Sequence, residues 1–432
     1  MEHADKKSFL EALFKKYADV PMEVVVKCEL IRNGFCFTRA ALDLDPRHKD
    51  YQLFSWDKSS VEDMEDQQAP VKLPDCIELK GGPYNLRRIR MRPIIDMQSP
   101  YLVDLVDGVN VVMDKVTREP IVDLLPFTKE PEYGALKFED GTLYRNIIAL
   151  DGDCIIFRQC QYWGPKNECK YCDINANAVK KMKLGQVPDI KVKSVEKVAE
   201  AARALFSDET FDPYHRPHHI HLNGGSITGE LKGLKEFDFY VRYAEAIVEK
   251  VGNRWPIILQ TSPFEKELEK EIRKIGNITR MSNYEVWDKD LFEIICPGKA
   301  KNISRDDWIR MVVDQVDVYG EGNVCPGFVA GVEMAGPWGF KTVEEAVKST
   351  TEGMDFFMSR GVVVRPLHWV VEALSALGGQ EPPPVDYYIQ IDRNWFELWS
   401  KYNLPPVVGL MQVGPGLNWF HATGAFDMAV MA

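Results

Sequence analysis

Three closely spaced cysteines are the first feature of this sequence that could carry chemistry. Cys160, Cys169 and Cys172 fall in one short stretch, with eight residues between the first two and two between the last two. Thiolates bind iron–sulfur clusters, and three of them leave one iron of a four-iron cluster without a protein ligand. Tyr171, directly before the last cysteine, would place an aromatic ring beside the metal. The spacing therefore favours a metal site with one open position.

A closed zinc site is the alternative interpretation of the same stretch. Cys154 lies just upstream and, with Cys160, Cys169 and Cys172, makes four thiols, which is the number that a structural zinc ion takes. Cys154 also belongs to the strand-like run 154–157, where a cysteine is expected to pack as a small apolar side chain. From the residues alone, both interpretations stay open.

The elements that must position these residues alternate in type from about residue 150. Short apolar runs typical of buried strands are separated by longer amphipathic runs typical of helices. The strand-like runs are 154–157, 219–222, 257–261, 279–286, 324–332 and 362–365, and the helix-like runs are 195–206, 237–251, 266–275, 305–316 and 343–358. Six alternating units predict an α/β fold with a parallel sheet and helices outside it. We interpret it as a partial (βα)6 barrel, in which chemistry belongs at the C-terminal ends of the strands.

The first part of the chain has a different pattern, which predicts a β-rich accessory domain with little helix. A short amphipathic helix is expected at 8–17. Residues 22–41 resemble two strands that meet at a hairpin turn, Asn33-Gly34, and the runs 103–115 and 134–150 are also strand-like. The polar, acidic stretch 56–72 is expected to be an exposed loop.

These patterns divide the chain into three parts. Residues 1–145 form the accessory domain, 146–370 the partial barrel, and 371–432 a C-terminal extension. The extension is rich in aromatic residues and includes a helix-like segment at 395–402, so it is not expected to be disordered. We expect the extension to cap the open side of the barrel.

The cysteine stretch resembles the signature of the radical S-adenosylmethionine (radical SAM) superfamily, Cys-x3-Cys-x-aromatic-Cys. Cys169, Tyr171 and Cys172 match the second half of that signature, whereas the first half is lengthened to give an atypical Cys-x8-Cys-x2-Cys loop. The resemblance covers roughly residues 150 to 370. It implies a partial barrel that binds a [4Fe-4S] cluster and S-adenosyl-L-methionine (SAM).

The resemblance also implies a SAM contact after the second strand of the barrel. Members of the superfamily carry a Gly-Gly-Glu-like motif there, whose backbone holds the amino group of SAM. Here the motif is represented by Gly224, Gly225 and Ser226, with the serine in place of the acid. Without the resemblance, a glycine pair at this point would indicate a tight strand-to-helix turn.

Polar residues after the fourth strand match the place where the superfamily binds the ribose of SAM. Glu285 is the first candidate, because a carboxylate can accept hydrogen bonds from two neighbouring hydroxyl groups, and Asn283 is the second. Lys299 and Arg305 follow and are candidates to pair with the carboxylate of SAM.

The fifth and sixth strands provide further candidates. Gly331 ends a Gly-x-Val-x-Gly run that resembles the adenine-binding strand of the superfamily, with Val329 in the apolar place. The alternating glycines equally indicate close packing of a strand on a helix. Arg365 and His368, at the end of the sixth strand, are expected either to face a substrate or, for the histidine, to be hydrogen-bonded in the core.

Four histidines precede and enter the second strand. His219 and His221 alternate onto one strand face, whereas His215 and His218 are expected in a loop. Zinc or iron binding by this group is a minor alternative to ordinary packing.

Composition excludes several classes of protein. The 432 residues carry a formal net charge of −12, which argues against nucleic acid as a partner because phosphate binding needs a basic face. No apolar run reaches the roughly 18 residues of a membrane span, and the first residues lack the apolar core of a signal peptide. We therefore expect a cytoplasmic protein whose cysteines are thiols or metal ligands.

The resemblance implies an enzyme. One electron delivered through the cluster, from a donor such as flavodoxin or ferredoxin, would cleave SAM to methionine and a 5′-deoxyadenosyl radical, which takes a hydrogen atom from an unidentified substrate. Alternatives within the class are methyl transfer, sulfur transfer and rearrangement of a carbon skeleton. From a different class comes a non-catalytic protein on the same barrel, stabilised by zinc on four cysteines.

Overall fold

The computed structural model describes residues 5–43, 49–50, 72–73, 77–125, 131–183, 192–213, 215–411 and 422–431. Nearly all of the loop predicted at 56–72 lies outside the described residues, and so do residues 412–421 of the predicted extension. None of the described helices is long and apolar enough to cross a membrane.

Six parallel strands occupy the part of the chain where the alternating pattern was found. They are β9 (Asp153–Ile155), β10 (Ile220–Asn223), β11 (Ile257–Leu259), β12 (Ile278–Arg280), β13 (Gly327–Ala330) and β14 (Arg365–His368). The first four form one parallel sheet in chain order, and the last two form a parallel pair. Isolated parallel bridges from Arg280 to Val324 and from Glu285 to Phe328 join the two groups. An α/β protein with parallel sheets is therefore confirmed.

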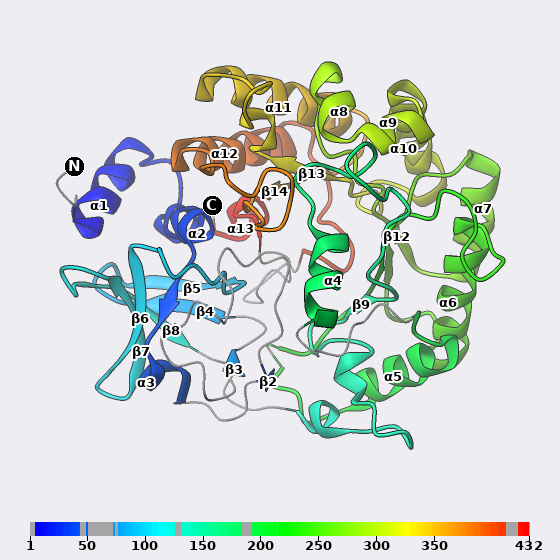
Figure 1. Cartoon of the computed structure of the whole chain (residues 1–432), viewed down its shortest axis with the longest axis horizontal. Helices are drawn as coiled ribbons and strands as arrows, with labels where there is room; N and C mark the ends of the chain where they lie inside the picture. The colour runs from blue at the N-terminus through cyan, green and yellow to red at the C-terminus, as the bar shows by residue number, and fades with distance from the viewer. Residues whose placement is uncertain are drawn as a thin grey trace.

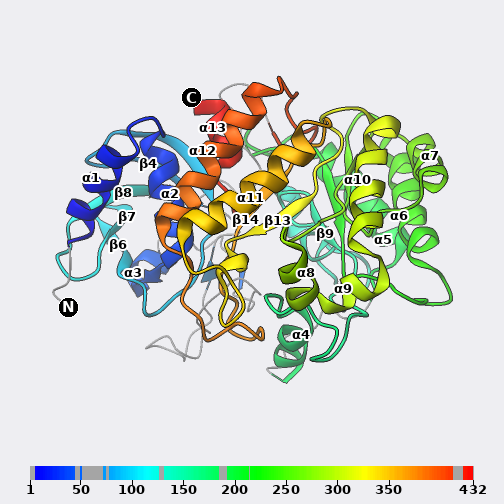
Figure 2. The same ribbon diagram turned by 90° about the horizontal axis from the view of Figure 1, so that it is seen from above.

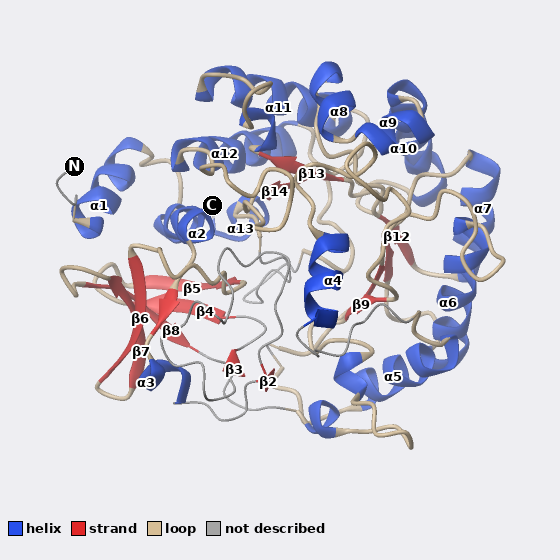
Figure 3. Ribbon diagram, viewed as in Figure 1, coloured by secondary structure: helices blue, strands red, loops and turns tan. Residues whose placement is uncertain are grey.

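Helices cover the outer side of these strands. The main ones are α5 (Val195–Ser207), α6 (Glu236–Val251), α7 (Lys266–Ile275), α10 (Arg305–Tyr319) and α11 (Val343–Met358), and each matches a predicted helix within a few residues. Figures 1 and 3 show them as an arc around the strands. Side chains cap the first turns of α5, α10 and α11; at α11, Thr342 and Glu345 form the predicted capping box.

Three short helices were not predicted. Helix α4 (Ile174–Lys183) follows the cysteine stretch and lies inside the arc of outer helices in Figure 1. Helices α8 (Lys289–Ile295) and α9 (Pro297–Asn302) come between β12 and α10. Cys296 separates these two helices, which places its thiol next to the strand ends.

The N-terminal region contains a six-stranded sheet with the order β1-β6-β7-β8-β4-β5. Its strands are β1 (Cys36–Phe37), β4 (Ile77–Gly81), β5 (Leu86–Met91), β6 (Tyr101–Val106), β7 (Val109–Asp114) and β8 (Pro120–Leu125), and a further short pair is formed by β2 (Lys49–Asp50) and β3 (Lys72–Leu73). The predicted strands at 103–115 are confirmed as the hairpin of β6 and β7. Helices α1 (Lys6–Lys16) and α3 (Arg39–Asp43) flank the sheet.

The strand prediction for residues 22–33 is wrong, because this segment is helix α2 (Met22–Asn33). Residues 23–31 of α2 are all buried, and a helix that is buried on every side lacks the amphipathic period by which helices are recognised. Gly34 ends the helix with a φ of 66°, so Asn33-Gly34 is a helix terminus rather than a hairpin turn. The region thus has more helix than predicted.

Strands are also absent from the described residues of the run 134–150. The chain forms two short 3-10 helices there, Glu132–Ala135 and Tyr144–Asn146. Only a single antiparallel bridge, between Lys137 and Leu143, spans the segment Glu139-Asp140-Gly141, where the sequence pattern also predicts a hairpin turn. The turn is present, but the flanking strands are not.

The C-terminal extension packs against the N-terminal helices. Helices α12 (Val385–Lys401) and α13 (Ala425–Met431) contact each other and α2, and Figure 2 shows this group from above. Lys27 of α2 forms a buried ion pair with Asp427 of α13 at 2.7 Å. One hydrophobic core contains residues from Leu10 to Met428, and the division into three domains stays a prediction.

Candidate functional site

A cavity of about 400 Å³ lies at the C-terminal ends of the parallel strands. A volume of this size lies within the range of small-molecule sites. Nine of the ten residues predicted to bind metal or SAM line it: Cys160, Cys169, Tyr171, Cys172, Gly224, Gly225, Ser226, Asn283 and Glu285. Gly331 is not a lining residue. With other lining residues such as Gln260, Val329 and Leu367, residues on or just after all six parallel strands are gathered in one place.

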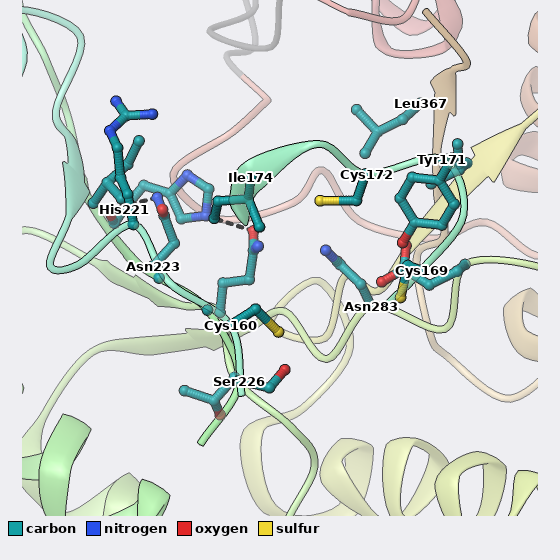
Figure 4. Close-up of a pocket in the computed structure, with 18 of the residues that line it drawn as sticks. Cys160, Cys169, Tyr171, Cys172, Ile174, His221, Asn223, Ser226, Asn283 and Leu367 are labelled. Atoms are coloured by element: carbon teal, nitrogen blue, oxygen red, sulfur yellow. Dashed lines mark hydrogen bonds between the residues drawn. The ribbon is translucent and has the colours of Figure 1, made fainter. Parts of the chain in front are cut away.

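The three loop cysteines point into the cavity. Each is partly exposed, and Figure 4 shows their side chains directed at a common space. Backbone hydrogen bonds fix the loop: the N–H of Gln161 donates to Ser226 at 2.9 Å, and that of Lys170 donates to Ile295 at 2.8 Å. The thiols are thus held at the cavity wall by the ends of β10 and α8.

Cys154 lies on the opposite face of its strand. Asp153 and Ile155 line the cavity, whereas Cys154 is fully buried in the hydrophobic core. The alternation of side chains along a strand accounts for this difference. The prediction that Cys154 packs is confirmed, and the four-cysteine zinc site that includes it is not assembled in the structure.

The thiol of Cys169 contacts a cysteine from outside the loop, the buried Cys296. A hydrogen bond with Cys296 lowers the pKa of Cys169; burial opposes this effect, and the charge of Lys299 adds to it. A lower pKa favours the thiolate, which is the form that ligates metals. By contrast, burial raises the pKa of both Cys160 and Cys172.

The glycine pair after β10 is explained by packing within the protein. A Cβ atom at Gly225 would overlap the carbonyl oxygen of Gln159, and one at Gly224 would lie 2.7 Å from the Tyr240 hydroxyl. The missing side chains therefore allow the end of β10 to press against the cysteine loop. A contact between this backbone and SAM stays a prediction.

Asn283 and Glu285 lie side by side at the cavity. The Oδ1 atom of Asn283 accepts a hydrogen bond from the N–H of Gly327 at 2.8 Å, which leaves the amide nitrogen to face the space between the cysteines in Figure 4. Glu285 has a φ of 81°, a conformation that is strained for a residue with a side chain. Backbone bonds between Glu285, Gly327 and Val329 hold it there.

Lys299 forms a buried ion pair with Glu285. Its Nζ donates to Oε1 of Glu285 at 2.5 Å and to the carbonyl of Asn283 at 2.8 Å. Burial alone would lower the pKa of Lys299, but attraction to Glu285 and the neighbouring thiols raises it above its usual value. The lysine therefore stays charged beside the cavity. Arg305 does not line the cavity and donates instead to the carbonyl of Trp287 at 3.1 Å.

The fifth strand contributes Val329 but not Gly331. Val329 lines the cavity. Gly331 has a φ of 109°, and a Cβ atom there would lie 2.7 Å from Cγ of Pro383 and 3.5 Å from the ring of Tyr387. Packing of the strand end on α12 thus explains Gly331.

A polar group of residues lines the side of the cavity away from the cysteines. The ring of His221 contacts Asp153 through Nδ1 at 3.2 Å and Gln260 through Nε2 at 3.0 Å. Asn223 donates to the same oxygen of Asp153 at 2.5 Å. His219 also lines the cavity, and burial lowers its pKa to about 3. Asp153, Asn223 and Gln260 were not predicted, although their alternation with buried neighbours was a usable signal.

The sixth strand and the loop after it complete the wall. Arg365 lines the cavity, and burial lowers its pKa to about 10. Glu372 accepts a hydrogen bond from the N–H of Asp173 at 2.7 Å, and burial raises its pKa well above the usual value. His368 belongs to the wall, but its ring is fully buried and is bonded to Asp392.

Several lining residues could not have been found from sequence motifs. Arg92 reaches the cavity from the N-terminal region, Arg158 from the loop before Cys160, and Glu236 from the start of α6. Arg92 ends a run in which Arg88, Arg90 and Arg92 alternate, a pattern that favours a solvated strand edge over a site for acidic ligands, whereas no motif or period marks Arg158 and Glu236. Their place follows only from how distant segments pack.

No family model and no curated protein matches this sequence. Solved structures to which the chain is similar include radical SAM enzymes. They include methylornithine synthase (PylB; 15% identity, TM-score 0.40, 61% of this chain and 71% of that chain), the [FeFe]-hydrogenase maturase HydG from Carboxydothermus hydrogenoformans (12%, 0.38, 60% and 54%) and coproporphyrinogen III oxidase (HemN) from Escherichia coli, described as a radical SAM enzyme (10%, 0.35, 58% and 51%). The chain spans about half the length of the last two.

Proposed function

We propose that this protein is a radical SAM enzyme, built on an open barrel of six βα units, that takes a hydrogen atom from a small substrate. The observation that carries the proposal is the meeting of three accessible thiols from one loop with the five other parallel strands at a single cavity. When bound, a [4Fe-4S] cluster with one open iron would supply the electron that splits SAM into methionine and a 5′-deoxyadenosyl radical.

The residues present are suited to such a cluster. All eight described cysteines are free thiols, so no disulfide competes for Cys160, Cys169 or Cys172. The hydrogen bond from Cys296 and the charge of Lys299 favour the thiolate at Cys169. Three thiols line one cavity, whereas Cys154 and Cys296 are fully buried and do not line it, which matches a site that keeps one position for a ligand.

Asn283 and Glu285 are proposed to hold the ribose of SAM. Lys299 occupies Oε1 of Glu285, and the other carboxylate oxygen has no hydrogen-bond partner among the described residues. That oxygen can accept a bond from a ribose hydroxyl. The amide nitrogen of Asn283 would donate to the same part of the ligand, and Val329 would provide an apolar contact for adenine.

The substrate is proposed to lie on the polar side of the cavity, near His221, Asp153 and Gln260. These side chains are already joined by hydrogen bonds, so little reorganisation is needed when a polar molecule enters. The enclosing wall formed by Glu372, Arg365 and the apolar residues after β14 excludes water, which protects a reactive radical from quenching.

An electron donor such as reduced flavodoxin or ferredoxin is part of the proposal, as is a cytoplasmic location. Both rest on the chemistry of the cysteine loop, because accessible free thiols persist in a reducing compartment.

The proposal is tested by anaerobic reconstitution with iron and sulfide, followed by incubation with SAM and dithionite. We expect slow formation of 5′-deoxyadenosine and methionine without any substrate. A variant with alanine at all three loop cysteines is the control and should form neither. S-adenosylhomocysteine as the main product would indicate an ordinary methyltransferase, and a protein that binds zinc but forms no product would indicate a structural site. Either result would overturn the proposal.

A further inference from the structure

A second group of metal-ligating side chains shares only His368 with the cavity wall. Cys28 of α2, His368 of β14 and Asp392 of α12 offer ligand atoms that all lie within 4.8 Å of one another. Sγ of Cys28 is 3.2 Å from Oδ2 of Asp392, and Nε2 of His368 is 2.9 Å from Oδ1. These separations are close to the edges of a tetrahedral zinc site, whose metal–ligand bonds are about 2.0–2.3 Å.

The three side chains are withdrawn from solvent. Cys28 and Asp392 have no exposed surface, and His368 is 3% exposed. Lys27 forms an ion pair with Asp427 at 2.7 Å, and its charge also acts on Cys28. A buried carboxylate is unfavourable without a compensating charge. A divalent cation on one thiolate, one carboxylate and a neutral imidazole would make the whole group electrically neutral.

The hydrogen bonding of His368 is incomplete among the described residues. Nε2 faces Asp392, but Nδ1 is buried without a hydrogen-bond partner. Leaving a buried polar atom unsatisfied costs about 1–3 kcal/mol. The ring nitrogen that faces Asp392 is Nε2, so Nε2 is the atom that would ligate a metal ion shared with Asp392.

The surroundings of Asp392 provide a fourth possible ligand atom, a hydroxyl oxygen, and a backbone segment that packs closely against the carboxylate. The Thr423 hydroxyl lies 3.3 Å from Oδ1 of Asp392, and a Cβ atom at Gly424 would overlap Oδ2. The group therefore joins four segments that are far apart in the sequence: α2, β14, α12 and the turn before α13. A metal ion at such a junction stabilises the packing of all four.

We propose that Cys28, His368 and Asp392 bind a structural zinc ion that fastens the N-terminal helix α2 and the C-terminal helices to the last parallel strand. On binding, the Cys28 thiol releases its proton and the thiolate takes its place as a ligand. The site is independent of the loop cysteines, which neither contribute to it nor depend on it.

The test separates this site from the loop cysteines by removing the latter. The full chain with Cys160, Cys169 and Cys172 changed to alanine is produced in zinc-supplemented cells, and its zinc is measured by mass spectrometry after dialysis. We expect about one zinc per chain, and a thiolate-to-metal absorption band when cobalt replaces zinc. Wild-type holoprotein is measured in parallel and should hold the same zinc in addition to its iron.

Cys28→Ser is the decisive variant, because a serine hydroxyl keeps the hydrogen bond to Asp392 but is a poor zinc ligand. In the chain that lacks the three loop cysteines, Cys28→Ser should lower the zinc bound per chain about tenfold or more. It should also abolish the cobalt absorption band. Cys36→Ser, at a buried thiol that bonds the carbonyl of Tyr101 instead, should keep both. If holoprotein and background alike contain no zinc, or if Cys28→Ser retains it, the group is only a hydrogen-bonded junction and the proposal is wrong.

Discussion

The molecule contains two groups of cysteines with opposite properties. Cys160, Cys169 and Cys172 come from one loop, are partly exposed and face a cavity. Cys28 comes from a buried helix, and its neighbours His368 and Asp392 lie more than 300 residues further along the chain. The hydrogen-bonded pair Cys28 and Asp392 is separated by 364 positions. The first group is open to a ligand that arrives after folding, whereas the second can be formed only by folding itself.

This contrast teaches how position decides the role of a thiol. An accessible thiol with a lowered pKa, such as Cys169, is prepared to exchange protons or metals with the solvent. A fully buried thiol that donates to a carboxylate, as Cys28 does to Asp392, stabilises the packing of the helices that carry the two residues. The following experiments either break this distinction or make it more definite.

The largest effect is expected from replacing the loop cysteines one at a time. Each of Cys160→Ala, Cys169→Ala and Cys172→Ala should lose essentially all bound iron, because a four-iron cluster cannot be held by two thiolates. Cys28→Ser and Cys154→Ala should keep their iron, since both thiols are buried away from the cavity. Iron analysis and visible absorption of the reconstituted proteins measure the difference. Loss of the cluster in Cys154→Ala would contradict the assignment.

The next largest effect concerns two buried lysines, one beside each group. Lys299 pairs with Glu285 at the cavity, and Lys27 pairs with Asp427 next to Cys28. Lys299→Met and Lys27→Met should each lower the free energy of unfolding by about 3–5 kcal/mol, because each leaves a buried carboxylate without its partner. Urea denaturation measures this change.

Binding of SAM separates the two lysine variants. Only Lys299→Met should weaken it, because Glu285 is the proposed ribose ligand and loses the ammonium group that positions it. Calorimetric titration of the folded, reconstituted proteins provides the measurement. Equal weakening in both variants would mean that the loss reflects general destabilisation, and the proposed role of Glu285 would then fail.

A smaller effect is expected at two glycines that allow close packing at each group. Gly225→Ala should displace the loop at Gln159 and lower the iron content, whereas Gly424→Ala should press on Asp392 and lower the zinc content. Forcing a methyl group into a packed site costs about 1–3 kcal/mol. Gly229→Ala is the control, because its Cβ would meet nothing closer than 3.7 Å. Equal metal loss in all three would contradict the idea of two separate sites.

The same contrast explains how much the sequence could predict. The loop cysteines and the residues at strand ends depend on local spacing, so nine of the ten predicted site residues line the cavity. The alternation of strands and helices was also predicted, since each unit follows the previous one along the chain. Local patterns carry both kinds of information.

The remaining features depend on distant packing. Helix α2 was mistaken for strands because burial on all sides erases its period. The packing alternative for Gly331 agrees with the structure, but its neighbour, Pro383 of the extension, could not be identified from the sequence. The neighbours Cys28, His368 and Asp392 share no spacing rule, so nothing in the sequence joins them.

The smallest expected effect is a pH dependence of stability at Glu236, on the cavity wall. Burial raises the pKa of Glu236, although hydrogen bonds from Ser262 and Ile227 oppose this effect. In the unfolded chain the carboxyl loses its proton near its usual pKa of 4.5, whereas the folded chain retains it to a higher pH. Wild-type stability therefore falls as the pH rises above that value, and Glu236→Gln, which cannot ionise, should gain relative stability over the same range.

The glutamine carbonyl can still accept the hydrogen bond that Oε1 takes from Ile227 at 3.2 Å, so a structural loss should not hide the gain. Urea denaturation of Glu236→Gln and wild type at about pH 5 and about pH 8 measures it, and Glu249→Gln, on the exposed face of the same helix, is the matched control. A difference that shrinks as the pH rises would mean that Glu236 is ionised in the folded protein. The cavity wall would then carry a fixed negative charge, and a cationic substrate would be favoured over a neutral one.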